Sequence, residues 1–165
     1  MHTKTLKTGI RVQRYFIYLA YDGTNYHGWQ IQPNGCSVQE CLMKALSTFL
    51  RREVEVVGAG RTDAGVHAIG QVANFHLDEH FSAEEIFEDL NRHLPEDIAV
   101  TKIKEVDDRF HSRYQAVEKT YRYRIRTSPV PNVFERKFLY QYGQTLDVDK
   151  MKKLSTIRNQ KMPKN

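Results

Sequence analysis

Residues 15–21 read YFIYLAY, a dense run of aromatic and apolar side chains that Asp22-Gly23 closes. Aromatic and β-branched residues are favoured in strands, whereas Asp-Gly favours a turn. The run therefore predicts a strand that ends in a turn.

An amphipathic helix is predicted next, over residues 37–51. Ser37 and Glu40 have the spacing of a capping box, which marks the start of a helix. The apolar residues that recur at helical spacing are Val38, Cys41, Leu42, Ala45, Leu46 and Phe49. A short strand is predicted over 54–57, and it leads into a loop that starts at Gly60.

A second strand and a second helix follow this loop. Residues 72–77 predict the strand, and Ser82 with Glu85 forms another capping box that starts the helix. Pro95 helps to end the helix, and residues 98–106 predict a further strand. The residues predicted to face inward are Ala73, Phe75 and Leu77 in the strand and Ile86, Leu90 and Leu94 in the helix.

The elements thus run strand, helix, strand, strand, helix, strand. This order is that of a ferredoxin-like, or split βαβ, arrangement. It predicts an α+β fold with an antiparallel sheet and both helices on one face. The other face is then free for a partner or for RNA. An extra strand is predicted over 117–127, before the breaker at residues 128–132.

Composition bounds the class of protein. With 165 residues, 40% hydrophobic and 27% charged, the chain can bury the core of one domain. No apolar run approaches the roughly 18 residues of a membrane span, and no signal peptide is evident, so a cytoplasmic protein is predicted. Cys36 and Cys41 are too few for a disulfide framework and match no zinc pattern. Cys41 is therefore predicted to pack as a free thiol.

Charge is distributed unevenly along the chain, whose net charge is +5. Residues 15–110 hold 8 Lys/Arg and 16 Asp/Glu, a net of −8, whereas residues 111–138 hold 7 and 2, a net of +5. The basic residues of 111–138 alternate with Tyr114, Tyr121 and Tyr123. Basic side chains beside aromatic rings suit phosphate neutralisation and base stacking, so this region predicts nucleic-acid binding.

The loop GRTDAGVHA, residues 60–68, places one acid between a base and small residues. Gly60 and Gly65 allow a tight turn and a close approach to a ligand. Arg61 favours the ionised form of Asp63. A lone carboxylate held forward suits a nucleophile or a base, and the alternative is a turn in which Asp63 caps backbone N–H groups.

Strand alternation sorts residues 117–127 into two faces. One face carries Lys119 and Tyr121, and the other carries Arg122, Arg124 and Arg126. From the pattern alone, Tyr121 is a core tyrosine and the arginine face is the RNA candidate.

Several motifs resemble the TruA family of tRNA pseudouridine synthases. The loop at 60–68 resembles the signature of that family, and residues 14–30 resemble its opening strand and loop. Further similar segments are SVQE at 37–40, NRHLP at 91–95, FHSR at 110–113 and KTYRY at 119–123. The resemblance runs from about Arg14 to about Leu154.

This resemblance implies an isomerase that converts uridine to pseudouridine in the anticodon stem-loop, at tRNA positions 38, 39 and 40. Asp63 is then the nucleophile, attacking either C1′ of the ribose or C6 of the uracil. Tyr121 matches the tyrosine that stacks on the target uracil. Arg61 would hold the position that the flipped uracil vacates, or bind a flanking phosphate. The alternative is that Arg61 only forms a salt bridge to Asp63. The base is detached, rotated and reattached, so no cofactor and no metal are needed.

Two other loop residues, His67 and Trp29, each have two possible roles. His67 lies four residues after Asp63, and we expect it to order the loop rather than bind a metal. Trp29 either binds substrate from its glycine-flanked loop or covers the edge of the core.

The resemblance ends early, because family members have two related halves and about 250 residues in total. The expected domains are a flexible basic extension over 1–13, a catalytic domain over 14–145, and a truncated start of the second half over 146–165. A homodimer is implied by the resemblance. The alternatives are a truncated, catalytically inactive RNA-binding relative and, more remotely, a dimeric aspartic protease.

Overall fold

The computed structural model describes residues 12–159. It forms two compact units, which we call unit 1, through Lys119, and unit 2, from Thr120 onward. Most of the extension predicted over 1–13, and the last six residues of the tail, lie outside the described residues.

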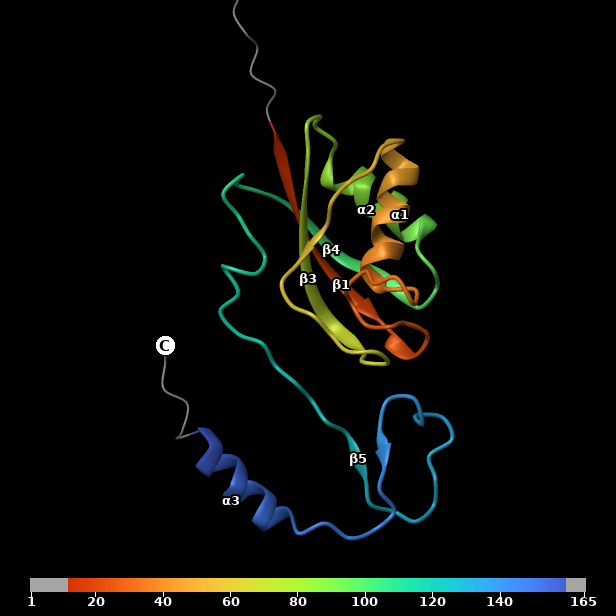
Figure 1. Ribbon diagram of the computed structural model, residues 1–165, viewed down its shortest axis with the longest axis vertical. Helices are drawn as coiled ribbons and strands as arrows, with labels where there is room; N and C mark the ends of the chain where they lie inside the picture. The colour runs from red at the N-terminus through yellow and green to blue at the C-terminus, as the bar shows by residue number, and fades with distance from the viewer. Residues whose placement is uncertain (1–11, 160–165) are drawn as a thin grey trace, which may run out of the picture. The chain divides into compact units, whose positions relative to one another are not determined.

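Unit 1 is built on a four-stranded antiparallel sheet in the order β2-β3-β1-β4 (Figure 1). Its strands are β1 (Gln13–Tyr21), β2 (Val57–Gly58), β3 (Ala68–Leu77) and β4 (Ile98–Val106). The run YFIYLAY forms most of β1, and Ile17 of that strand lies opposite Ala73 on one side and Ile103 on the other. A strand with neighbours on both edges is covered most fully, which explains why β1 is so apolar.

Two helices lie on the same side of this sheet (Figure 1). Helix α1 (Val38–Leu50) follows the N-cap Ser37, whose hydroxyl accepts a hydrogen bond from the backbone N of Glu40 at 3.2 Å. Helix α2 (Ala83–His93) begins with a complete capping box between Ser82 and Glu85. Both helix starts and the limits of β4 confirm the sequence predictions.

The core lies between the sheet and the helices. Alternate residues of β1 turn inward, and the Tyr15 ring stacks on Phe75 of β3 with the ring centroids 5.3 Å apart. The predicted inward faces are confirmed, because the following side chains are buried: Ala73, Phe75, Leu77, Ile86, Leu90 and Leu94. Burial of such apolar area is the main stabilising term of the unit.

The opposite face of the sheet, expected to be free, is partly covered. Phe16 of β1 packs edge-on against Phe110, with ring centroids 4.8 Å apart. Ser112 donates from its backbone N to Oδ1 of Asn74 and from its hydroxyl to the Val57 carbonyl, both at 2.9 Å. The FHSR motif therefore anchors the chain after β4 to this face.

The short strand predicted over 54–57 was wrong for its first three residues, because β2 begins at Val57. Val54 and Val56 are buried while Glu55 is exposed, so the segment alternates like a strand. Pairing with β3 reaches only Val57 and Gly58, however, and a strand needs a neighbour as well as the right side chains.

Unit 2 contains β5 (Ile125–Arg126), β6 (Tyr140–Gln141) and α3 (Val148–Asn159). The two short strands pair in parallel. The strand predicted over 117–127 was wrong except at Ile125–Arg126, since residues 117–124 and Thr127 belong to neither sheet in the part of the chain that the structure describes. The chain is thus α+β, and no helix among its described residues has the length and apolarity needed to cross a membrane.

Candidate active site

The loop that carries Asp63 connects β2 to β3 at one edge of the sheet of unit 1. The backbone turns after Asp63, whose carbonyl accepts a hydrogen bond from Val66 N at 3.2 Å. Gly65 adopts φ = +74°, a left-handed conformation that favours glycine, so the predicted tight turn at this residue is confirmed. Asp63 is exposed at the tip of this turn.

A second loop, residues 22–29, holds the Asp63 loop in place through the backbone. Trp29 N donates to the Thr62 carbonyl, and Gly65 N donates to the Tyr26 carbonyl, each at 3.1 Å. Gly28 makes this approach possible, because a Cβ at that position would lie only 2.2 Å from the Thr62 carbonyl oxygen. The carboxylate of Asp63 therefore sits between two anchored peptide groups.

Aromatic side chains support the same loop from the core. The hydroxyl of Tyr21, the last residue of β1, lies 3.0 Å from Oγ1 of Thr62. Burial raises the pKa of this phenol, which keeps the hydroxyl protonated. Trp29 stacks on Tyr21 with a centroid distance of 6.5 Å and is only 3% exposed. Of the two roles left open for Trp29, the structure thus shows packing.

The carboxylate of Asp63 is not used in holding the loop. Among residues 12–159, no hydrogen bond or ion pair engages it, so it neither caps backbone N–H groups nor forms a salt bridge with Arg61. The neighbouring peptide oxygens are engaged instead: Gln71 donates to the Gly60 carbonyl at 2.8 Å and Lys119 to the Arg61 carbonyl at 3.3 Å. The backbone is fixed while the acid remains open to a reactant.

His67 closes the far end of the loop. Its Nδ1 lies 3.1 Å from both the backbone N of Gly23 and Oδ1 of Asp22. An unprotonated Nδ1 accepts the Gly23 N–H, and a protonated one pairs with Asp22, so either form ties the loop to the residues after β1. This contact fits the loop-ordering role predicted for His67. Within the described chain, no three His, Cys, Asp or Glu side chains gather as a metal site would require.

Comparison with known proteins shows the family to which this chain belongs. The sequence pattern of the family described as tRNA pseudouridine synthase matches residues 17–115, more than half of the chain. The chain belongs to the tRNA pseudouridine synthase family. The matched region contains the whole Asp63 loop and the loop that holds it, and it confirms the resemblance to the TruA family.

Individual relatives agree with this assignment. The chain is 56% identical over 140 residues to tRNA pseudouridine synthase A of Bacteroides thetaiotaomicron, a match that covers 85% of this chain and 51% of the relative. It is 57% identical over 141 residues to the protein of the same name from Bacteroides fragilis, covering 85% and 55%. It is 43% identical over 144 residues to tRNA pseudouridine synthase A 1 of Protochlamydia amoebophila, covering 87% and 56%. The chain therefore spans about half the length of the curated relatives it matches.

The third predicted site residue, Tyr121, belongs to unit 2, whereas Asp63 and Arg61 belong to unit 1. Its side chain is 61% exposed. The interpretation of Tyr121 as a core tyrosine is therefore wrong for this chain, since the strand that would have buried it does not form at residues 117–124.

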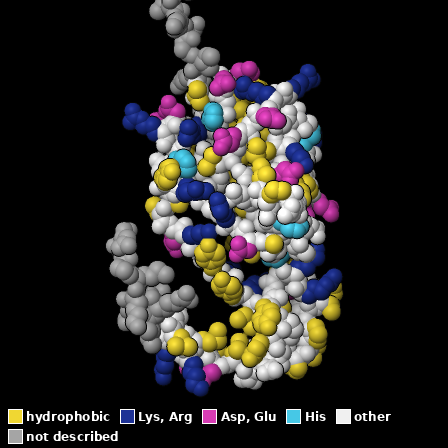
Figure 2. Space-filling view, in the orientation of Figure 1, with side chains coloured by type: hydrophobic (Ala, Val, Ile, Leu, Met, Phe, Trp, Pro, Cys, Tyr) yellow, Lys and Arg dark blue, Asp and Glu magenta, His cyan; other side chains and the backbone are white. Residues whose placement is uncertain are grey.

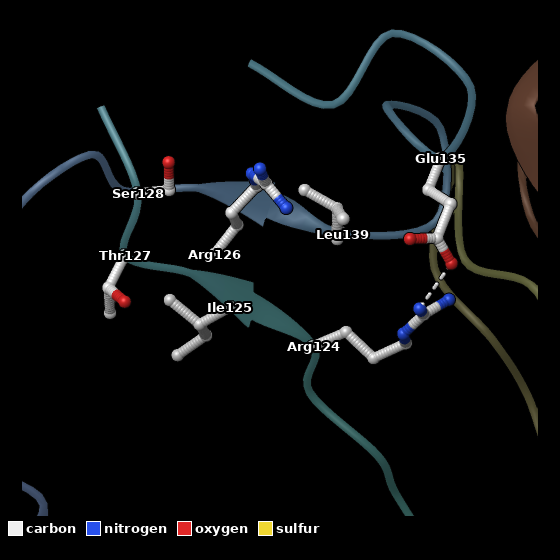
Figure 3. A pocket seen from close by; sticks show the side chains of 7 residues that line it. All are labelled: Arg124, Ile125, Arg126, Thr127, Ser128, Glu135 and Leu139. Carbon is white, nitrogen blue, oxygen red and sulfur yellow. Dashed lines mark hydrogen bonds and ion pairs between the residues drawn. The ribbon is translucent and has the colours of Figure 1, made fainter. Parts of the chain in front are cut away.

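The arginines predicted to form one RNA-binding face are not on a common strand. Figure 3 shows a hollow of unit 2 in which Arg124 points toward Glu135, and the two side chains form an ion pair of 2.5 Å. This hydrogen-bonded contact holds the pKa of Glu135 below its ordinary value. Arg126 donates from Nε to the Val130 carbonyl at 3.0 Å. These two arginines thus help to order the turn between β5 and β6.

Unit 2 also exposes many apolar side chains, visible in yellow in Figure 2. Its most exposed large apolar residues are Tyr123, Val130, Phe134, Tyr140 and Leu154. Exposed apolar side chains that gather on one part of a chain favour contact with another protein segment or with a ligand.

Three further residues support the candidate site and were not predicted from the sequence: Tyr21, Asp22 and Thr62. Their contacts join distant parts of the chain, such as Tyr21 and Thr62, which are 41 positions apart in the sequence. The available signal was that Tyr21 and Asp22 stand at the end of a buried strand, where side chains of a rigid element can reach a neighbouring loop.

Proposed function

We propose that this chain is the nucleophile-bearing half of a tRNA pseudouridine synthase that isomerises uridine to pseudouridine in the anticodon stem-loop of tRNA. The observation that carries the proposal is the carboxylate of Asp63. It is exposed, it is engaged by no hydrogen bond or ion pair among the described residues, and it stands on a backbone anchored on both sides.

Asp63 acts as the nucleophile in this proposal, at C1′ of the ribose or at C6 of the uracil. The glycosidic N1–C1′ bond breaks, the base turns, and its C5 bonds to C1′. C5 then loses a proton, N1 gains one, and the bond to Asp63 is released, so the atoms of substrate and product are the same. No electron acceptor and no added group are required.

The target base must leave its stack before Asp63 can reach it, at a cost of a few kcal/mol. We assign Tyr121 to stack on the extruded uracil and so to offset part of this cost. We assign Arg61 to fill the position that the extruded uracil leaves in the RNA stack, or to bind a flanking phosphate. Exposure of both side chains supports these roles.

The proposal extends to the whole protein. The strand order and the two helices on one side support a ferredoxin-like unit 1. The predicted catalytic domain over 14–145, and the start of a second domain over 146–165, remain predictions. The matches cover only 51% and 55% of two relatives, and this coverage, together with the apolar surface of unit 2, supports a further half and a homodimer that cover this surface.

Pseudouridine mapping of tRNA incubated with the purified chain tests the proposal. We expect product with the wild type, none with Asp63→Asn, and wild-type product with Asp108→Asn, which changes another exposed acid of unit 1. Binding of tRNA by Asp63→Asn should stay within a few-fold, because Asn keeps the shape of Asp. Substantial turnover by Asp63→Asn would end the assignment of the nucleophile.

A second candidate function follows from the length of the chain, which covers 51% to 56% of the three relatives compared above. A chain without the other half would bind RNA but not catalyse. Retained tRNA binding with no product from the wild type would favour this candidate.

A further inference from the structure

The start of α1 carries two thiols side by side. Cys36 immediately precedes the N-cap Ser37, and Cys41 is the fourth residue of the helix. In many helices these two positions hold apolar side chains that pack on one another and fix the direction in which the chain enters. Here both positions are cysteines, and their Sγ atoms lie 3.5 Å apart.

The two thiols differ in their surroundings. Cys36 is exposed, whereas Cys41 is half-buried and packs against the core of unit 1. Both are free. The sulfur atoms are about 1.5 Å farther apart than the atoms of a disulfide bond. One thiol is therefore accessible to a reagent in solution, and the other lies where it can react with the first.

We propose that Cys36 and Cys41 form a modification site at which a small-molecule disulfide closes an intrachain disulfide. The Cys36 thiolate attacks one sulfur of the reagent, which forms a mixed disulfide and releases the first small thiol. The Cys41 thiolate then attacks the Cys36 sulfur and releases the second. The protein loses two protons and two electrons, and the reagent is reduced to two thiols.

The order of these steps follows from the surroundings of each sulfur. Burial raises the pKa of the Cys41 thiol to about 12. Only a small fraction of Cys41 is thiolate at neutral pH, which slows the closing step. Its rate should increase with pH, because the thiolate fraction increases, and the mixed disulfide at Cys36 should be visible as an intermediate.

The pair lies beside the loop that anchors Asp63. The Cys36 carbonyl accepts a hydrogen bond from His27 N at 2.9 Å, and Gln39 N donates to the Trp29 carbonyl at 3.0 Å. Trp29 N in turn binds the Thr62 carbonyl. The disulfide would thus link two residues at the start of α1, the part of the helix that is hydrogen-bonded to residues 27–29.

The test uses the reduced full chain and oxidised glutathione, with mass spectrometry after acid quenching and alkylation of remaining thiols. We expect the wild type to pass through one glutathione adduct to a monomer that has lost two hydrogen atoms and resists alkylation. Cys41→Ser should stop at the adduct, and Cys36→Ser should react far more slowly than either. Circular dichroism establishes that each variant is folded. If a serine variant does not fold, the alanine variant at the same position takes its place.

A folded wild type that stops at glutathione adducts would overturn the proposal, as would one that forms only disulfides between chains. Conversion of the adduct that does not accelerate with pH would remove Cys41 from the closing step. None of these measurements involves RNA, so they are independent of the proposed synthase activity.

Discussion

At the scale of single residues, substitutions of Tyr121 distinguish a role in RNA binding from a role in stability. Its side chain is 61% exposed, so Tyr121→Ala should change the free energy of unfolding by no more than about 0.5 kcal/mol. Loss of stacking should weaken the binding of an anticodon stem-loop by about 1–3 kcal/mol, whereas Tyr121→Phe should bind normally. Fluorescence anisotropy and urea unfolding on the same variants measure both quantities. Tyr140→Ala, with a ring 65% exposed, is the control. Full RNA affinity of a folded Tyr121→Ala chain would remove Tyr121 from the site.

At the scale of elements, the start of α2 depends on one serine. The Ser82 hydroxyl accepts a hydrogen bond from Glu85 N at 3.1 Å, and Glu85 accepts one from Ser82 N at 2.9 Å. Ser82→Ala should lower the free energy of unfolding by about 1 kcal/mol in urea titrations. Ser47→Ala, inside α1, should be neutral or slightly stabilising, because alanine favours a helix interior. Equal effects of the two substitutions would show that the cap contributes nothing.

The same capping box gives the start of α2 a dependence on acid. The backbone hydrogen bond from Ser82 holds the pKa of Glu85 below its ordinary value. A carboxylate with a lowered pKa in the folded state stabilises that state above its ordinary pKa, and this contribution is lost as the pH falls through the lowered value. The surface position of Glu85 keeps this effect small.

At the scale of the whole molecule, charge separates along the chain. Residues 15–110 carry a net of −8 and residues 111–138 a net of +5. Affinity for RNA should therefore fall steeply with salt, with a log–log slope of about 0.7–0.9 for each phosphate neutralised. Arg122→Gln, which removes an exposed charge from this region, should reduce the slope by about that amount. The matched substitution Lys102→Gln, on the exposed part of β4 in the acidic region, should leave it unchanged. Affinity that does not vary with salt would exclude residues 111–138 as the RNA surface.

Local elements of the fold follow from neighbouring residues along the chain. Both helix starts, the limits of β4 and the buried face of β3 were predictable, because capping and side-chain periodicity act over a few residues. The sequence also placed Asp63 on a turn at Gly65, since few residues other than glycine adopt that conformation.

Contacts between distant parts of the chain became known from the folded structure. It showed that Trp29 packs on Tyr21, that Tyr21 supports Thr62, and that Asp22 and Gly23 meet His67. It also showed that residues 117–124 join neither sheet of the described chain. Strand-forming side chains become a strand only beside a second strand that completes their hydrogen bonds, and which segments become neighbours is a property of the folded chain.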